Sequence, residues 1–165
     1  MICTGRYSNK NLRTDGYYQV GISVGRPKFP LGYELRDQCY MLAPRRDMLS
    51  MEKARYKNAY YAKLDAAGEQ KVINYVRNLE KRAEAEGKKL ALLCFEDIRN
   101  PEDWCHRRMF AEWWQEHTGE AIEEIPEVDP PRVKKTKAAA LPRAEEKKEA
   151  EPEDPFEQLS LFFRW

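Results

Sequence analysis

Residues 94–107 hold several side chains that can act as nucleophiles, acids, bases or anion-binding groups. They are Cys94, Glu96, Cys105, His106 and Arg107. The first two end an apolar run that favours a buried strand, and the last three open a segment with helical periodicity. Ligands of open α/β sheets bind at the carboxyl ends of the strands. The spacing therefore predicts one site on the two sides of a single loop.

The predicted helix start determines the chemistry of this group. With Asp103 as the N-cap, Cys105 and His106 occupy the first helical turn. Free backbone amides and the helix dipole attract an anion there, and they lower the pKa of a thiol. Arg107 can clamp a phosphate or carboxylate, and Glu96 is a candidate base. We interpret all five residues as candidate catalytic residues.

Simpler roles remain open for the same residues. Cys94 can be a small buried residue at the end of a strand, Cys105 can pack the helix, and Glu96 can orient Arg107. A zinc site from Cys94, Cys105 and His106 is a further alternative. Because the sequence lacks paired metal-ligand spacing, we expect neither a metal nor a cofactor.

The elements that must position the site alternate between strands and helices. Strands that alternate with helices form α/β folds, so we expect a small three-layer α/β sandwich with a mostly parallel sheet. A proline-containing segment at 27–49 favours a long functional loop. The expected strands are 2–4, 18–24, 90–95 and 121–125, and the expected helices are 51–66 (capped by Ser50), 69–86 and 104–117.

The composition of the chain changes after Pro126. Residues 127–155 hold prolines and charge blocks but no aromatic residue. Such a segment buries too little apolar surface to offset its ordering entropy. Apolar and aromatic side chains return in residues 156–165. We divide the chain into an α/β domain at 1–126, a disordered linker at 127–155 and a C-terminal linear motif at 156–165.

The tail contains a pentapeptide formed by Gln158, Leu159, Ser160, Leu161 and Phe162. It resembles the bacterial sliding-clamp-binding peptide, whose pattern is Gln-Leu-(Ser or Asp)-Leu-Phe, at all five positions. The resemblance implies that the glutamine binds a small pocket and the Leu-Phe pair fills an apolar cleft of the clamp. Two buried anchors contribute roughly 2 kcal/mol each, and ordering a free peptide keeps the binding free energy near about −8 kcal/mol. The alternative is that the tail packs on its own domain.

The segment with the candidate site also resembles the domain-of-unknown-function family 488. The resemblance covers residues 1–126 and implies a compact α/β fold without an established reaction. It rests on Leu-Leu-Cys-Phe-Glu at 92–96, Cys-His-Arg at 105–107 and Phe-Ala-Glu-Trp-Trp at 110–114, and more weakly on 4–8 and 56–64.

Basic and aromatic residues are interleaved in the first third of the chain. Residues 1–60 hold eleven Lys and Arg against five Asp and Glu, whereas the whole chain has a formal net charge of +1. Basic side chains neutralise phosphates, and aromatic faces stack on unpaired bases. The alternative is a solvated surface around tyrosines in the core. The candidate nucleic-acid contacts are Arg6, Lys10, Arg26, Lys28, Arg45 and Arg46.

The apolar residues, the N-terminus and the cysteines indicate where in the cell the protein is expected. The sequence contains no run of about 18 apolar residues, which a membrane-spanning helix would require. Its first residues lack the features of a signal peptide. Four irregularly spaced cysteines favour free thiols. We therefore expect a cytoplasmic protein.

Two functions fit these observations. The first is an enzyme, of lyase, glycosidase or transferase type, that acts on DNA or nucleotides and is recruited by the sliding clamp in replication or repair. The second is a non-enzymatic partner of the clamp, either an adaptor that binds DNA or a competitor from a phage or mobile element.

Overall fold

Five parallel strands form one sheet in the order β3-β2-β4-β1-β5. The computed structural model describes residues 1–131, so the predicted tail motif and most of the predicted linker lie outside the described residues. The central strand β4 pairs along its length with β1 and β2, and Arg6 and Gly21 lie opposite its last two residues. The strands are β1 (Ile2–Arg6), β2 (Tyr17–Gly21), β3 (Asp37–Gln38), β4 (Lys89–Cys94) and β5 (Glu123–Glu124).

The strand order requires the connections between strands to lie on both faces of the sheet. The connections from β1 to β2 and from β2 to β3 cross the sheet in one direction, and those from β3 to β4 and from β4 to β5 cross in the other. Because parallel crossovers share one hand, opposite directions require opposite faces. The helices belong to the second pair of connections: α1 (Lys53–Ala67), α2 (Glu69–Ala85) and α3 (His106–Thr118).

The side chains of β4 show the two faces directly. Leu90, Leu92 and Cys94 join the cluster formed with the three α-helices. Ala91 and Leu93 point the other way, into a smaller cluster. The unbroken apolar run of β4 therefore reflects burial on both faces, and each fully buried leucine contributes about 2 kcal/mol.

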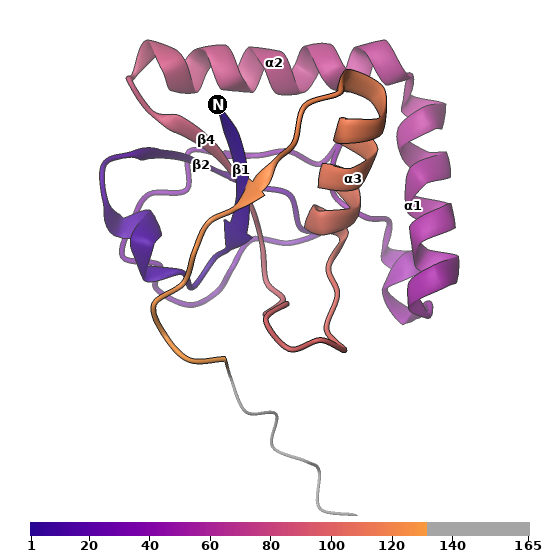
Figure 1. Ribbon diagram of the computed structural model, residues 1–165, viewed down its shortest axis with the longest axis horizontal. Helices are drawn as coiled ribbons and strands as arrows, with labels where there is room; N and C mark the ends of the chain where they lie inside the picture. The colour runs from indigo at the N-terminus through magenta and orange to yellow at the C-terminus, as the bar shows by residue number, and fades with distance from the viewer. Residues whose placement is uncertain (132–165) are drawn as a thin grey trace, which may run out of the picture. The chain divides into compact units, whose positions relative to one another are not determined.

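The helical layer lies on one face only. Figure 1 shows α1 and α3 side by side, with α2 running across the amino end of the sheet. The opposite face is covered by the 3₁₀ helix η1 (Lys10–Arg13) and the loop that carries Leu31 and Leu35. The α/β class with a parallel sheet is confirmed, and its third layer consists of a short helical turn and a loop.

Several element boundaries differ from those expected. Helix α1 begins after Glu52, because Ser50 belongs to a second 3₁₀ helix, η2 (Arg46–Ser50). Helix α3 begins at His106, and its N-cap is Cys105, not Asp103. Cys105 has an extended backbone with φ −149° and ψ 147°, which keeps it out of the helix.

The folded contacts continue beyond the predicted domain boundary at residue 126. The Glu127 carboxylate is buried and pairs with Arg6. Lys10 binds Asp129 at 2.9 Å, and Arg99 donates to the main-chain oxygen of Asp129. The start of the predicted linker is therefore part of the domain, because Glu127 and Asp129 contact basic residues of β1, of the 3₁₀ helix η1 and of the loop after β4.

Candidate functional site

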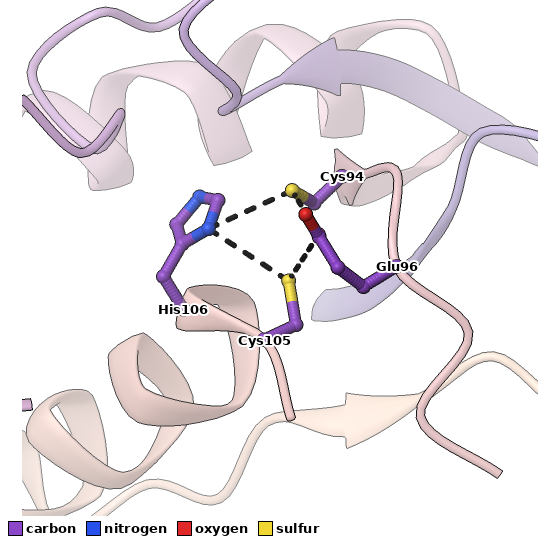
Figure 2. Close-up of side chains that lie close together, drawn as sticks. All are labelled: Cys94, Glu96, Cys105 and His106. Carbon is purple, nitrogen blue, oxygen red and sulfur yellow. Dashed lines mark hydrogen bonds between the residues drawn. The ribbon is translucent and has the colours of Figure 1, made fainter. Parts of the chain in front are cut away.

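The four side chains Cys94, Glu96, Cys105 and His106 converge at the carboxyl end of β4. Cys94 is the last residue of that strand, and Glu96 lies in the loop that follows. Cys105 caps α3 and His106 is its first helical residue. Figure 2 shows the side chains pointing toward one another from the two sides of the loop. This is the edge of the sheet where ligands bind in α/β folds, as the sequence predicted.

Both thiols contact the same carboxylate and the same imidazole nitrogen. Each sulfur lies 2.9 Å from Glu96 Oε2. The distances to His106 Nδ1 are 3.6 Å from Cys94 Sγ and 3.7 Å from Cys105 Sγ. Four potential ligand atoms thus lie within 4.8 Å of one another. Both cysteines and the histidine are buried, whereas Glu96 as a residue is exposed and turns one carboxylate oxygen inward.

The orientation of His106 is fixed from outside the cluster. Its Nε2 donates to the main-chain oxygen of Ile22 at 2.8 Å, and its ring meets Tyr60 edge-on with centroids 5.5 Å apart. A carbonyl can only accept, so Nε2 carries a proton in either charge state. Nδ1 is therefore the nitrogen presented to the two thiols.

A cavity of about 390 Å³ opens beside the cluster. Its size suits a small organic ligand. Tyr56 and Trp104 contribute aromatic walls, and their rings pack edge to face with centroids 4.8 Å apart. The four cluster residues also line the cavity, and the remaining lining residues come from three loops and η2: Ser23, Val24, Gly25, Pro44, Leu49 and Phe95.

Burial and mutual contact shift the ionisation of the two thiols in opposite directions. Burial raises the pKa of Cys94 well above its ordinary value, and Cys105 and Glu96 raise it further. Burial also acts to raise the pKa of Cys105. Hydrogen bonds from Cys94 and His106 and the positive charges of His106 and Arg107 outweigh burial, so the pKa of Cys105 lies well below its usual range.

The charge of Cys105 also shifts the pKa values of Glu96 and His106. Burial and then the charge of Cys105 raise the pKa of Glu96. Burial acts to lower the pKa of His106, but contact with Cys105 and the Ile22 carbonyl outweighs it, and that pKa is raised. These directions favour a thiolate at Cys105 beside a charged His106, and a protonated thiol at Cys94.

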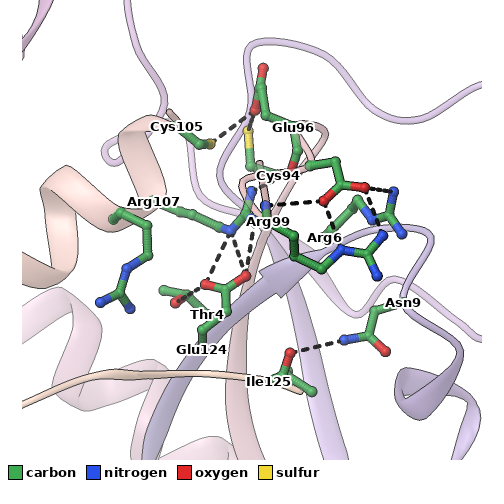
Figure 3. Close-up of polar contacts among 12 residues, drawn as sticks. Thr4, Arg6, Asn9, Cys94, Glu96, Arg99, Cys105, Arg107, Glu124 and Ile125 are labelled. Carbon is green, nitrogen blue, oxygen red and sulfur yellow. Dashed lines mark hydrogen bonds and ion pairs between the residues drawn. The ribbon is translucent and has the colours of Figure 1, made fainter. Parts of the chain in front are cut away.

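Arg107, which we expected to clamp an anion, is fully buried and does not line the cavity. Its Nε and Nη2 bind Glu124 Oε1 at 3.0 and 2.9 Å. Its Nη1 donates to the main-chain oxygen of Glu96 at 2.8 Å. Figure 3 shows the hydrogen bonds that tie Arg107 to Glu124. The geometry makes Arg107 a positioning residue for the loop of Glu96.

The predicted nucleic-acid contacts fall into two groups. Arg6 is buried and pairs with Asp97 and Glu127, so it is not available to phosphates. The exposed group consists of Lys10, Arg26, Lys28, Arg45 and Arg46, of which Lys10 pairs with Asp129 and Arg45 pairs with Asp47. Arg26 and Lys28 follow Gly25 in the sequence, Arg45 and Arg46 follow Pro44, and both Gly25 and Pro44 line the cavity.

Comparisons with models of known protein families, with curated proteins and with solved structures found no match for this chain. The resemblances to family 488 and to the clamp-binding peptide therefore remain predictions. Among residues 1–131, none of the helices combines the length and apolar character that crossing a bilayer requires.

Three residues that complete the site were not predicted. Ile22 contributes a backbone carbonyl, which no side-chain pattern reveals. Tyr56 and Tyr60 reach the site from one face of α1, at a spacing of one helical turn. Their spacing predicts a buried face, but only the fold shows that this face borders the thiols.

Proposed function

We propose that this protein is an enzyme acting on DNA or nucleotides, recruited to a bacterial sliding clamp by its C-terminal peptide. One observation carries the enzymatic part: two thiols, a carboxylate and an imidazole converge on the wall of a cavity. Groups whose pKa values are pushed apart at a cavity mark candidate catalytic sites. Core packing alone does not require two cysteines to share both one carboxylate oxygen and one imidazole nitrogen.

The walls of the cavity support a nucleotide-like substrate. Trp104 and Tyr56 provide aromatic surface against which a planar ring can stack. Exposed Arg26 and Arg46 lie in the segments that carry the lining residues Gly25 and Pro44. A base inside the cavity and a phosphate outside it would use both features.

Recruitment by the clamp rests on the tail sequence. Residues 158–162 match the clamp-binding pattern at every position and follow a long polar segment. A chain of about 30 residues allows a domain to reach DNA near its attachment point, at a raised effective concentration. The reaction would be of lyase, glycosidase or transferase type, because the site offers sulfur and carboxylate groups for covalent or acid–base steps.

A non-enzymatic adaptor or clamp competitor is the second candidate. It is favoured by one observation: Arg107 and Arg6, the basic residues expected to hold a phosphate, are committed to internal ion pairs. In that case the exposed arginines would contact DNA and the clamp peptide alone would carry the activity.

Two double variants of the full-length chain separate these functions. Leu161→Ala/Phe162→Ala is expected to lose binding to a purified bacterial clamp, measured by calorimetry, and to lose clamp-dependent action on primed DNA. Cys105→Ala/His106→Ala is expected to bind the clamp normally but to form no product from DNA or nucleotides, measured by mass spectrometry. Failure of the wild-type chain to bind the clamp would refute recruitment. Undiminished clamp-dependent action of Cys105→Ala/His106→Ala on primed DNA would favour the adaptor.

A further inference from the structure

Two cysteine sulfurs, a histidine nitrogen and a carboxylate oxygen form a ligand set around a common centre, at the wall of the cavity. Eight residues, 97–104, separate the first two contributors, Cys94 and Glu96, from Cys105 and His106, and the fold brings the four side chains together. Thiolate and imidazole together favour zinc over hard cations such as Mg²⁺ and Ca²⁺. The cluster thus has the donor chemistry of a zinc centre, independently of any role of the tail.

The distances within the cluster fit a tetrahedral zinc ion. Zinc binds sulfur at about 2.3 Å and imidazole nitrogen at about 2.0–2.1 Å, so tetrahedral geometry places sulfur and nitrogen about 3.6 Å apart. The two observed separations between sulfur and His106 Nδ1 are 3.6 and 3.7 Å. Both sulfurs therefore stand at the distance from His106 Nδ1 that tetrahedral zinc requires.

The surroundings of His106 support the same conclusion. A histidine that binds a metal generally donates its other ring nitrogen to a carbonyl or carboxylate, which fixes the ring and its tautomer. His106 does this through Nε2, which donates to the Ile22 carbonyl at 2.8 Å. The arrangement leaves Nδ1 as the only ring nitrogen directed at the two sulfurs.

Glu96 differs from the other three donors. It is the exposed member of the set, and its oxygen lies 2.9 Å from each sulfur. Around a tetrahedral zinc ion an oxygen would stand about 3.5 Å from each sulfur. Glu96 must therefore move outward when a metal enters, and its loop position on the cavity side allows this movement. A zinc site with three firm ligands and one replaceable ligand is the pattern of catalytic centres.

We propose that Cys94, Cys105 and His106 bind one zinc ion, with Glu96 as a fourth ligand that water or substrate can replace from the cavity. Binding removes every proton carried by the two sulfurs and by His106 Nδ1, forms two Zn–S bonds and one Zn–N bond, and releases those protons to solvent. With Glu96 displaced, the ion would present a bound water to the cavity, and Glu96 could accept its proton. This proposal goes beyond the proposed function, since the ion could be held whether or not the chain binds a clamp.

The chain provides matched controls for a metal-binding experiment. All four cysteines and both histidines lie in residues 1–131, so Cys39 and His117 are the same residue types outside the cluster. His117 Nδ1 is instead engaged with the Trp113 carbonyl at 2.7 Å. The tail contains neither cysteine nor histidine, so thiolate ligation cannot come from it.

The test uses the full-length chain, with any affinity tag removed, loaded with zinc and then desalted. Elemental analysis should find one zinc per chain in the wild type, in Cys39→Ser and in His117→Ala. It should find less than a tenth of that in Cys105→Ser and in His106→Ala. Glu96→Gln should retain zinc through the three firm ligands. Cobalt loading should give a thiolate-to-cobalt absorption band in the wild type that is weakened in Cys105→Ser.

Circular dichroism of each chain excludes unfolding as the cause of metal loss. A folded wild-type chain that retains no zinc and gives no cobalt band would overturn the proposal, as would equal zinc retention by Cys105→Ser and Cys39→Ser. Clamp binding measured on the same preparations keeps the two proposals distinct. A chain that binds the clamp without zinc refutes only the metal site, and a chain that binds zinc without the clamp refutes only recruitment.

Discussion

Arg107 donates a hydrogen bond from Nη1 to the main-chain oxygen of Glu96, 2.8 Å away, across the loop between β4 and α3. The same guanidinium pairs with Glu124, which also accepts a hydrogen bond from Thr4 Oγ1 at 2.8 Å. The edge strand β5 and the first helical turn of α3 are thereby tied to the residue that faces the thiols. Arg107 serves the site through this contact, without entering the cavity.

Loss of the Arg107 side chain should destabilise the domain substantially. Removing one member of a buried ion pair costs about 3 kcal/mol, because the other member is left buried without a partner. Here the Glu96 carbonyl would also lose its hydrogen bond from Arg107. Arg107→Ala is therefore expected to lower the free energy of unfolding by about 3 kcal/mol in denaturant titrations. Arg45→Ala is the control, because Arg45 and Asp47 form a pair with both side chains more than half exposed. It should change stability by less than about 0.5 kcal/mol, and equal effects of the two changes would contradict this interpretation.

Gly21 should tolerate no side chain. A Cβ there would meet Gln38 Oε1 at 2.2 Å and the Tyr7 hydroxyl at 2.4 Å. Overpacking of this kind costs about 1–3 kcal/mol, and it would shift Ile22, whose carbonyl holds His106. Gly21→Ala is expected to lower the melting temperature and to reduce zinc retention together. Gly25→Ala has open space around its Cβ and should behave like the wild type; a Gly21→Ala chain with unchanged melting would refute the close packing.

The contact of Glu127 with Arg6 extends the domain past residue 126. Both side chains are buried, with exposed fractions of 8% and 6%, so the pair is shielded from solvent. Because Arg6 keeps Asp97 as a partner, Glu127→Ala should lower the free energy of unfolding by about 2 kcal/mol. Glu123→Ala, at an exposed position of the preceding strand, should have no measurable effect. Identical denaturation curves for the two variants would place Glu127 outside the folded unit.

Metal removal should destabilise the wild-type chain and spare a chain that cannot bind metal. A ligand present at about a thousand times its Kd stabilises a fold by about 4 kcal/mol. A strong chelator is therefore expected to lower the melting temperature of the zinc-loaded wild type by several degrees. The melting temperature of Cys105→Ser should not respond to the chelator. A wild-type melting curve unaffected by chelation, measured by calorimetry, would contradict a metal bound by the folded state.

The sequence was sufficient to predict the elements that are long and strongly patterned. The strand β4 is shifted by one residue from the predicted 90–95, and α2 begins at the predicted residue 69 and ends one residue before the predicted 86. The site also followed from the sequence in outline, because residues at the end of a strand and the start of the next helix must share one edge of the sheet. Cys94, Glu96, Cys105 and His106 were predicted together for this reason.

The features that depend on distant contacts could not be predicted. Asp103 is a better N-cap than cysteine by local preference, yet α3 starts at His106 and Cys105 takes the cap. Arg107 was expected to bind an external anion, because nothing local shows that Glu124 on an edge strand would pair with it. A metal site was not expected because its ligands have no paired spacing in the sequence, and the fold alone places them within 4.8 Å.

The proposed function and the zinc site share one claim, that Cys94, Glu96, Cys105 and His106 form a single chemical centre. X-ray absorption at the zinc edge of the loaded full-length chain tests this claim most directly. The predicted spectrum shows two sulfur neighbours at about 2.3 Å and nitrogen or oxygen neighbours at about 2.0–2.1 Å. A zinc environment with no sulfur, or with only one, would show that the two thiols do not act together.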